Sequence, residues 1–330
     1  MSQLHGLTGA ALALLLGAGG AAGLPSVEIR EWPVPWEGTR PRDPSVAPDG
    51  RVWFAGQTGD YLAQLAPETG EFRRYELDPG TGPHNLIVDA QGIVWYAGNR
   101  AAHIGRLEPV SGAIAKIEMP DPAVRDPHTL VFDRKGDIWF TAQGANCVGR
   151  LTVATGEVRV VRVPTPEARP YGIDVDSRGR PWIVLFGTSK LATLDPATLA
   201  LREIPLPRAA ARPRRVAVTS DDRVWYVDYA GGRLGRYDPE SGKVDEWPAP
   251  SGAGSLPYAL AADHADRLWF VETGPQPNRL VGFDPKAGQV FSETPIPSGA
   301  HTVRHMVYHA PTRTLWFGTD ANTIGRARVP

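Results

Sequence analysis

Short segments in which apolar and polar residues alternate recur along nearly the whole chain, and no segment keeps a helical period. Alternation with a period of two is typical of half-buried β-strands. Turn residues separate the segments, as in Asp133–Gly136. In the clearest stretch these turns delimit four strands, at His84–Asp89, Ile93–Ala97, His103–Leu107 and Ala113–Met119. The pattern predicts an all-β protein.

A tryptophan marks each four-strand unit, and seven of the ten tryptophans recur at spacings of 42 to 47 residues. These seven are Trp53, Trp95, Trp139, Trp182, Trp225, Trp269 and Trp316. Four-stranded units at this spacing are typical of propeller blades, which bury their faces against neighbouring blades. We therefore expect a seven-bladed β-propeller with the tryptophans packed between blades. Gly-Arg pairs recur in equivalent third strands, at 105–106, 149–150, 235–236 and 325–326, and we expect their role to be structural.

The last unit ends near Ile324–Arg326 and lacks a fourth strand. We predict the missing strand at the other end of the chain, because Val27–Pro33 resembles the fourth strand at Lys243–Pro248 in sequence. Pairing the two ends would close the ring and cover an otherwise exposed strand edge. Residues 24–330 are therefore expected to form a single domain, with the last blade closed by the N-terminal strand.

Residues 1–23 are expected to be a signal peptide. The apolar stretch Leu7–Leu16 is too short to span a bilayer, and small residues follow it. This segment predicts a periplasmic or secreted protein without a membrane span once the leader is removed. Cys147 is the only cysteine, so disulfides cannot hold the fold.

The formal net charge is -1, and no long run of like charge occurs. This balance offers no electrostatic footprint for nucleic acid or for an anionic membrane. We expect a small-molecule partner and a monomeric protein.

The position eleven residues before each tryptophan is polar in every copy, at the start of the first strand of each unit. Its seven residues are Arg42, His84, His128, Tyr171, Arg214, Tyr258 and His305. In a propeller the first strand is innermost, so these side chains should surround one mouth of the central channel. A position that is polar in all copies does not suit dry packing, because buried polar groups cost free energy unless they are paired. We expect a wet, shared cavity there.

Carboxylates join this face at three positions. Asp228 and Glu272 lie three residues after a blade tryptophan, and Asp126 lies two residues before His128. Residues two apart in a strand point the same way, so Asp126 could orient His128 or share a metal with it, while His84 comes from the adjacent blade. The best chemical cluster is therefore His84, Asp126 and His128.

The third repeat carries a family resemblance. It reads Pro127-His128-Thr129-Leu130, then Gly136-Asp137-Ile138-Trp139-Phe140-Thr141, then Asn146-Cys147-Val148-Gly149-Arg150-Leu151. These motifs resemble the blades of the virginiamycin B lyases, also called streptogramin B lyases, and the resemblance extends over residues 27–329. It implies the propeller fold, Mg²⁺ as cofactor, and opening of a streptogramin B-type cyclic ester by elimination across a carbon–oxygen bond.

In that family a histidine and a Glu-Pro-His motif lie in the last two blades. The matching positions here read Pro257-Tyr258 and Val303-Arg304-His305, so the final histidine alone is kept. His305 is thus an alternative catalytic residue. An equivalent arrangement occurs as Pro83-His84 followed by Asp126-Pro127-His128, and rotation between related blades allows a shifted site. In this hypothesis Mg²⁺ binds near Asp126 and His84, and His128 removes the proton.

Two other function classes fit the same residues. A lactonase-like hydrolase would gather Asp126, Asp228 and Glu272 around one divalent ion. A non-catalytic binding or scaffold propeller would instead hold an acidic or sugar-like ligand through Arg42, Tyr171, Arg214 and Tyr258. Glu272 completes the set of substrate-binding candidates.

Overall fold

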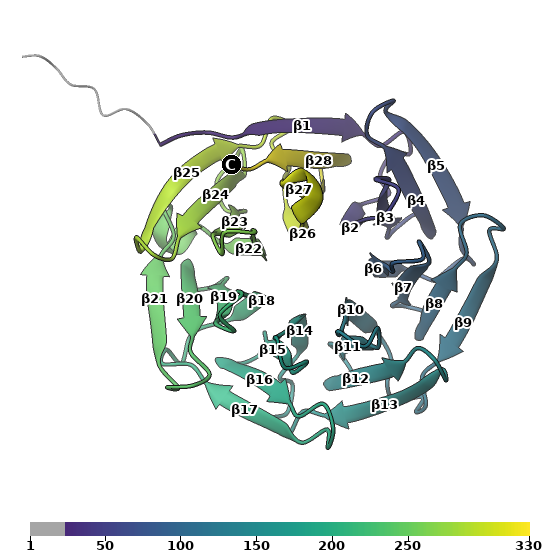
Figure 1. The fold of residues 1–330 in the computed structure, drawn as a ribbon, viewed down its shortest axis with the longest axis horizontal. Helices are drawn as coiled ribbons and strands as arrows, with labels where there is room; N and C mark the ends of the chain where they lie inside the picture. The colour runs from purple at the N-terminus through teal and green to yellow at the C-terminus, as the bar shows by residue number, and fades with distance from the viewer. Residues whose placement is uncertain (1–23) are drawn as a thin grey trace, which may run out of the picture.

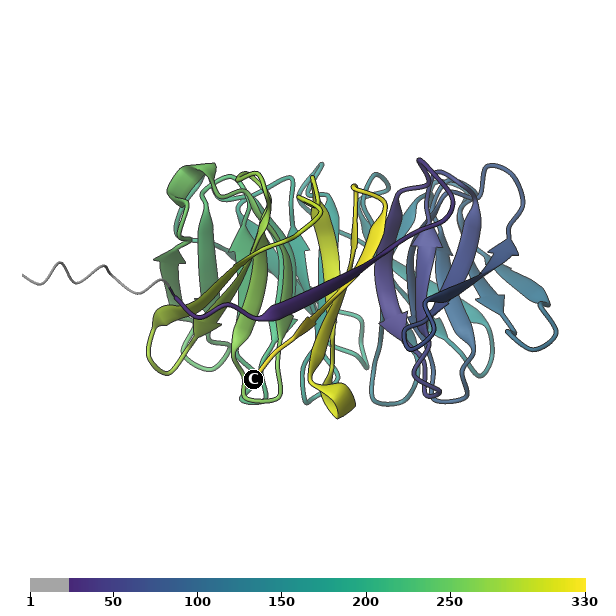
Figure 2. The same ribbon diagram turned by 90° about the horizontal axis from the view of Figure 1, so that it is seen from above.

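The computed structural model describes residues 24–330, and the expected signal peptide lies outside them. Seven four-stranded antiparallel sheets surround one axis (Figure 1). Seen from the side, the ring is a flat disc whose strands run between two loop-bearing faces (Figure 2). The predicted seven-bladed β-propeller is confirmed.

Six blades are built from consecutive strands. Blade 1 contains β2 (Pro41–Val46), β3 (Val52–Gly56), β4 (Tyr61–Ala66) and β5 (Glu71–Glu76). Blade 2 contains β6 (Pro83–Val88), β7 (Val94–Gly98), β8 (His103–Leu107) and β9 (Ile114–Glu118). Blade 3 contains β10 (Pro127–Phe132), β11 (Ile138–Ala142), β12 (Cys147–Thr152) and β13 (Glu157–Arg162). Blade 4 contains β14 (Pro170–Val175), β15 (Pro181–Leu185), β16 (Lys190–Leu194) and β17 (Leu201–Pro205).

The second half of the ring repeats this order. Blade 5 contains β18 (Pro213–Val218), β19 (Val224–Asp228), β20 (Arg233–Tyr237) and β21 (Val244–Pro248). Blade 6 contains β22 (Pro257–Ala262), β23 (Leu268–Glu272), β24 (Arg279–Asp284) and β25 (Gln289–Pro295). Blade 7 contains β26 (Val303–His309), β27 (Thr314–Thr319), β28 (Thr323–Arg328) and β1 (Glu28–Pro33). Two short 3-10 helices lie in loops, at Gly252–Gly254 and Ala310–Thr312.

The N-terminal strand closes the ring as predicted. β1 pairs antiparallel with β28 over its whole length, from Glu28 opposite Arg328 to Pro33 opposite Thr323. The indoles of Trp32 and Trp316 stack at 5.5 Å between ring centroids, so aromatic packing reinforces the pairing. Both ends of the described part of the chain thereby belong to one blade.

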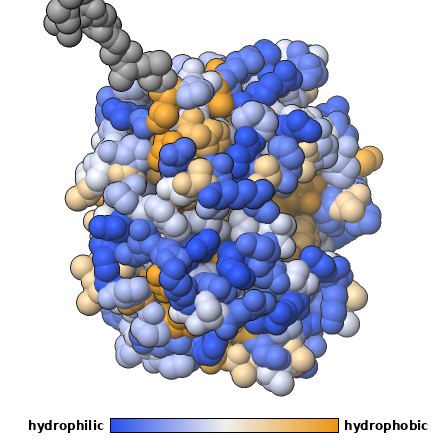
Figure 3. All heavy atoms as spheres, turned by 60° about the vertical axis from the view of Figure 1, so that its left-hand side comes forward, coloured by the Kyte–Doolittle hydropathy of each residue, from blue (hydrophilic) through white to orange (hydrophobic). Residues whose placement is uncertain are grey.

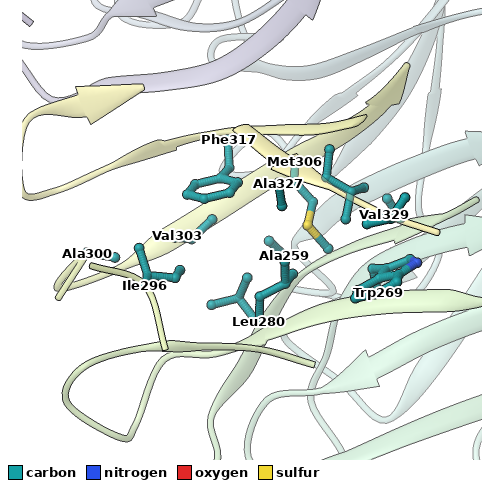
Figure 4. Close-up of a cluster of buried hydrophobic side chains, with 13 residues drawn as sticks. Ala259, Trp269, Leu280, Ile296, Ala300, Val303, Met306, Phe317, Ala327 and Val329 are labelled. Atoms are coloured by element: carbon teal, nitrogen blue, oxygen red, sulfur yellow. The ribbon is translucent and has the colours of Figure 1, made fainter. Parts of the chain in front are cut away.

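The blade tryptophans are core residues, each at most 4% exposed. Trp269 in β23, for example, packs with Leu280 of its own blade and with Met306 and Phe317 of blade 7 (Figure 4). Burial of such large apolar surfaces between blades is the main stabilising contribution in this all-β fold. The side of the ring shown in Figure 3 is mostly hydrophilic, and the described chain exposes few large apolar side chains.

The Gly-Arg pairs have a packing role. A Cβ added to Gly235 in β20 would meet the ring of Tyr226 in β19 at 2.1 Å, so only glycine leaves room for that ring. The arginine that follows, Arg236, covers the indole of Trp225 at 5.6 Å from the ring centroid. The other three pairs repeat this arrangement, with Arg106, Arg150 and Arg326 over their own blade tryptophans.

Within residues 24–330, no helix has the length and apolar character needed to cross a membrane.

Candidate functional site

The polar position at the start of each first strand brings its side chains together around the centre of the ring. The rings of His84 and His128 lie 3.6 Å apart between centroids, and those of His128 and Tyr171 lie 4.2 Å apart. The hydroxyls of Tyr171 and Tyr258 form a hydrogen bond between blades 4 and 6. Four of the blades therefore contribute contacting side chains at this position.

Every pairing between a first and a second strand contains a register shift at this position. In blade 3, Pro127 pairs with Ala142 and Leu130 pairs with Phe140, so two residues of β10 face one residue of β11. This is a β-bulge, which breaks the simple alternation of side chains. The residue after the polar position therefore also takes part in the site.

The bulges add Asp43, Asn85, Thr129 and Arg215 to the site, and these residues are buried. We name the whole group the central cluster; it consists of Arg42, Asp43, His84, Asn85, His128, Thr129, Tyr171, Arg214, Arg215, Tyr258 and His305. The sequence signal for the added residues was weak, because this position holds Gly172, Ala259 and Met306 in the other three blades.

Arg215 of the central cluster contacts residues of three other blades. Its Nη1 donates to Thr129 Oγ1 at 3.1 Å, and its Nε donates to the carbonyl oxygen of Arg304 at 2.9 Å. Its Nη2 lies 3.5 Å from the carboxylate of Asp43. One guanidinium thus links blade 5 to blades 1, 3 and 7.

Asp43 is the single carboxylate of the central cluster. It accepts hydrogen bonds from Arg42 Nε at 3.1 Å and from Asn85 Nδ2 at 3.1 Å. Burial alone would raise the pKa of Asp43, but the nearby Arg42 and Arg215 hold it below its usual range. Asp43 is therefore ionised at neutral pH.

Arg214 is held by aromatic rings. Its guanidinium carbon lies 3.8 Å from the ring centroid of Tyr258, 4.2 Å from Tyr229 and 4.7 Å from Phe186. Phe186 and Tyr229 follow their blade tryptophans by four residues, and inspection of that offset in the sequence would have found them. Cation–π contacts keep the guanidinium in place without neutralising it.

The three histidines of the central cluster are neutral at neutral pH. Burial and the nearby guanidiniums lower the pKa of His84 and His128 well below the usual value, and lower that of His305 to about 4. His84 Nδ1 lies 3.0 Å from the carbonyl oxygen of His128. Because a carbonyl only accepts, Nδ1 of His84 carries the proton and its Nε2 presents a lone pair.

The charges of the central cluster do not balance. Arg42, Arg214 and Arg215 are cationic, and Asp43 alone is anionic. Three buried polar atoms, Arg42 Nη2, Arg214 Nε and His305 Nδ1, have no hydrogen-bond partner among the described residues, and Arg215 Nη2 has only the ion pair with Asp43 at 3.5 Å. The site therefore presents an excess of positive charge and unused hydrogen-bonding groups.

Comparison with known proteins places the chain in a family. A model described as the Virginiamycin B lyase family matches residues 24–194 and 188–327, which together span most of the sequence. The chain belongs to the virginiamycin B lyase family. Among curated proteins, none matches this chain.

Solved lyase structures share the fold of this family member. The virginiamycin B lyase from Staphylococcus aureus superposes with a TM-score of 0.83 at 24% identity, over 92% of this chain and all of that one. A streptogramin B lyase structure gives 0.82 at 23% identity, over 92% and 98%. A catalytically inactive Staphylococcus aureus lyase with quinupristin gives 0.81 at 24% identity, over 92% and 100%. At these identities the likeness shows the fold alone.

Asp126 does not join the histidines of this virginiamycin B lyase family member. Its backbone φ of 60° lies in the left-handed region just before β10 begins, so the expected same-side alternation with His128 does not apply. The carboxylate accepts hydrogen bonds from the backbone N–H groups of Gly144 and Ala145. Thr129 Oγ1, at 2.9 Å, is the group bonded to Nδ1 of His128.

The two other candidate carboxylates are also bonded to loops. Asp228 pairs with Arg208 and accepts from the backbone N–H of Arg212 at 2.8 Å. Glu272 accepts from the backbone and hydroxyl of Ser251, both at 2.8 Å. Their role is to anchor the loops that lead into the first strands of blades 5 and 6.

The residues do not fit the Mg²⁺ site expected from the family resemblance. Residues 24–330 contain no group of three or more His, Cys, Asp or Glu side chains arranged to hold a metal ion. Mg²⁺ prefers oxygen ligands, whereas His84 is surrounded by His128 and guanidiniums, and Asp126 is bonded elsewhere. The three carboxylates proposed for a lactonase-like ion site do not converge either.

Proposed function

We propose that this protein binds a small carboxylate-bearing molecule at the central cluster without a metal ion. The observation that carries the proposal is the excess of positive charge, three guanidiniums against the carboxylate of Asp43, together with unpartnered N–H groups on Arg42 and Arg214. Buried N–H groups without partners are costly, and an anion would satisfy them.

Guanidinium groups suit carboxylates because their donors form a planar fork that can bond both oxygens. In the interior of the ring these bonds are screened less by water than at the surface. Arg214 and His305 are half-buried, whereas Arg42 and Arg215 are buried, so the ligand would enter past the first two. The excess of two positive charges favours a dicarboxylate over a monocarboxylate.

Calorimetric titration with succinate tests the proposal, and uncharged succinamide serves as the control ligand. We expect saturable binding of succinate that persists in the presence of EDTA, with no binding of succinamide. Arg214→Gln should weaken binding by roughly tenfold or more, because a charge-assisted contact is lost. Arg236→Gln, which removes a guanidinium from an outer strand of the same blade, should leave binding unchanged. Equal binding of succinamide, or full affinity in Arg214→Gln, would refute the proposal.

A carbon–oxygen lyase reaction on a streptogramin B-type cyclic ester is the second candidate. Family membership favours it, and so does the free lone pair on Nε2 of His84. In this reaction the base takes the α-proton, a double bond forms, and the ester carboxylate leaves. Mass spectrometry tests it, because elimination leaves the mass of the opened ring unchanged and hydrolysis adds one water. Activity should vanish in His84→Ala and persist in His103→Ala; an intact ester after incubation with the wild-type protein rules the reaction out.

A further inference from the structure

Tyr171 and Tyr258 meet at the centre of the ring although their blades are not adjacent. Their hydroxyls form a hydrogen bond, and the two side chains are 5% and 2% exposed. In such a pair one hydroxyl donates and the other accepts. If the accepting oxygen loses its own proton, the donated hydrogen bond stabilises the resulting anion.

The charged groups around this pair are cationic. The Arg214 guanidinium lies 3.8 Å from the ring centroid of Tyr258, and that of Arg215 lies 5.2 Å from the ring of Tyr171. Arg42 in β2 acts electrostatically on both tyrosines. The nearest carboxylate of the central cluster, Asp43, is already paired with Arg42 and Arg215.

Two further aromatic side chains contact the pair. The ring of His128 lies 4.2 Å from that of Tyr171, and the ring of Tyr229 lies 5.8 Å from that of Tyr258. His128 stays unprotonated at neutral pH because burial and the nearby guanidiniums lower its pKa.

The surroundings shift the pKa values of the two tyrosines in opposite directions. Burial alone would raise the pKa of Tyr171, but Arg215, Arg214 and Arg42 outweigh burial, so that pKa is lowered. Burial, followed by repulsion from Tyr171, raises the pKa of Tyr258. When the pair loses its first proton, the opposite directions of the two pKa shifts place the negative charge on Tyr171, and Tyr258 then donates to its oxygen.

We propose that Tyr171 and Tyr258 act as one proton-accepting pair, and that binding of an anionic ligand at the central cluster drives uptake of one proton by that pair. The inference rests on the proposed function for the ligand. In the free protein above the ionisation midpoint, the Tyr171 oxygen is the anion beside the three guanidiniums. When one carboxylate group of the ligand takes its place there, the Tyr171 oxygen accepts a proton from solvent, so that one negative charge beside the guanidiniums replaces another.

The first experiment uses the free protein and follows the ultraviolet absorbance of tyrosinate during a pH titration. We expect one tyrosine to ionise at lower pH than the other tyrosines. This early transition should be absent in Tyr171→Phe, shifted to higher pH in Tyr258→Phe, and unchanged in Tyr96→Phe, which removes a buried hydroxyl from blade 2. A titration without an early transition overturns the inference, irrespective of whether succinate binds.

The second experiment adds succinate above the midpoint of the early transition, in Tris and in triethanolamine. We expect tyrosinate absorbance to fall on binding. The two buffers differ in ionisation enthalpy, so the difference between the calorimetric binding enthalpies in them should correspond to uptake of one proton. The apparent association constant should fall about tenfold per pH unit above the midpoint, as uptake of one proton requires. In Tyr171→Phe this pH dependence should vanish.

The two proposals fail in different ways. An early tyrosine transition without any succinate binding refutes the proposed function and leaves the ionising pair in place. Succinate binding without proton uptake or loss of tyrosinate absorbance overturns the coupling and leaves the binding function in place.

Discussion

The guanidinium of Arg215 and the carboxylate of Asp43 lie 3.5 Å apart at the centre of the ring, although the two residues belong to blades 5 and 1. Both side chains are buried. Arg215 also bonds Thr129 and the carbonyl of Arg304, so the contact is part of a network that connects four first strands. Opposite sides of the ring are thereby held together by charge as well as by closure of the last blade.

Replacing Arg215 with Met should destabilise the protein by about 3 kcal/mol, because Asp43 and Thr129 lose a buried partner. The double variant Arg215→Met/Asp43→Asn should recover part of this loss, since the buried carboxylate is no longer charged. Urea denaturation measures both free energies of unfolding. Equal stability of the wild type and Arg215→Met would show that the pair contributes nothing.

Replacing Trp32 with Ala should destabilise the protein by about 3 kcal/mol, because Trp32 is 5% exposed and stacks on Trp316 where the ring closes. Val110→Ala is the control, since Val110 is 91% exposed. Thermal unfolding of the two variants measures the difference. If Trp32→Ala unfolds at the same temperature as the control, β1 does not hold the ring closed.

Replacing Gly235 with Ala should cost about 2 kcal/mol, because the added Cβ would lie 2.1 Å from the ring of Tyr226. Gly254 provides a matched control from a neighbouring loop, since a Cβ there would meet nothing within 4 Å. Denaturant midpoints compare the two substitutions. The packing role of the Gly-Arg pairs is contradicted if both variants are equally stable.

Asp174 should make the protein less stable as the pH rises. Burial raises the pKa of Asp174 in the folded protein to about 6, from the ordinary 3.8. Between these values the folded state holds a proton that the unfolded state has lost, so this residue favours folding less as pH increases through that range. The stability of Asp174→Asn relative to the wild type should therefore increase from about pH 4 to about pH 6. If the difference in stability between Asp174→Asn and the wild type is constant across that range, the pKa of Asp174 is not raised.

His305 should make the protein more stable as the pH rises. Burial and the nearby Arg215 lower the pKa of His305 to about 4 in the folded protein, from the ordinary 6.5. The stabilisation is complete above the ordinary value and is lost as the pH falls towards about 4, because the unfolded state gains a proton that the folded state excludes. One such group changes the free energy of unfolding by up to about 1.4 kcal/mol per pH unit. His305→Gln should show a correspondingly flatter acid profile in equilibrium unfolding.

The sequence by itself determined the blade number, the strand order and the closure. These follow from local signals that repeat, namely the tryptophan spacing, the alternation within strands and the turn residues between them. The match between Val27–Pro33 and Lys243–Pro248 located the closing strand before any contact was known, because equivalent strands in a propeller meet equivalent neighbours. The polar position at the start of each first strand was found for the same reason.

The tertiary structure alone decided which polar residues meet. Bulges in all seven first strands add Asp43 and Arg215 to the site, and alternation along a regular strand could not indicate this. The left-handed backbone conformation of Asp126 directs its carboxylate to the loop at Gly144 instead of to His128. The contact between Tyr171 and Tyr258 joins residues 87 positions apart. Such contacts depend on how blades are placed around an axis, and repetition in the sequence specifies each blade but not the side chains that meet at the centre.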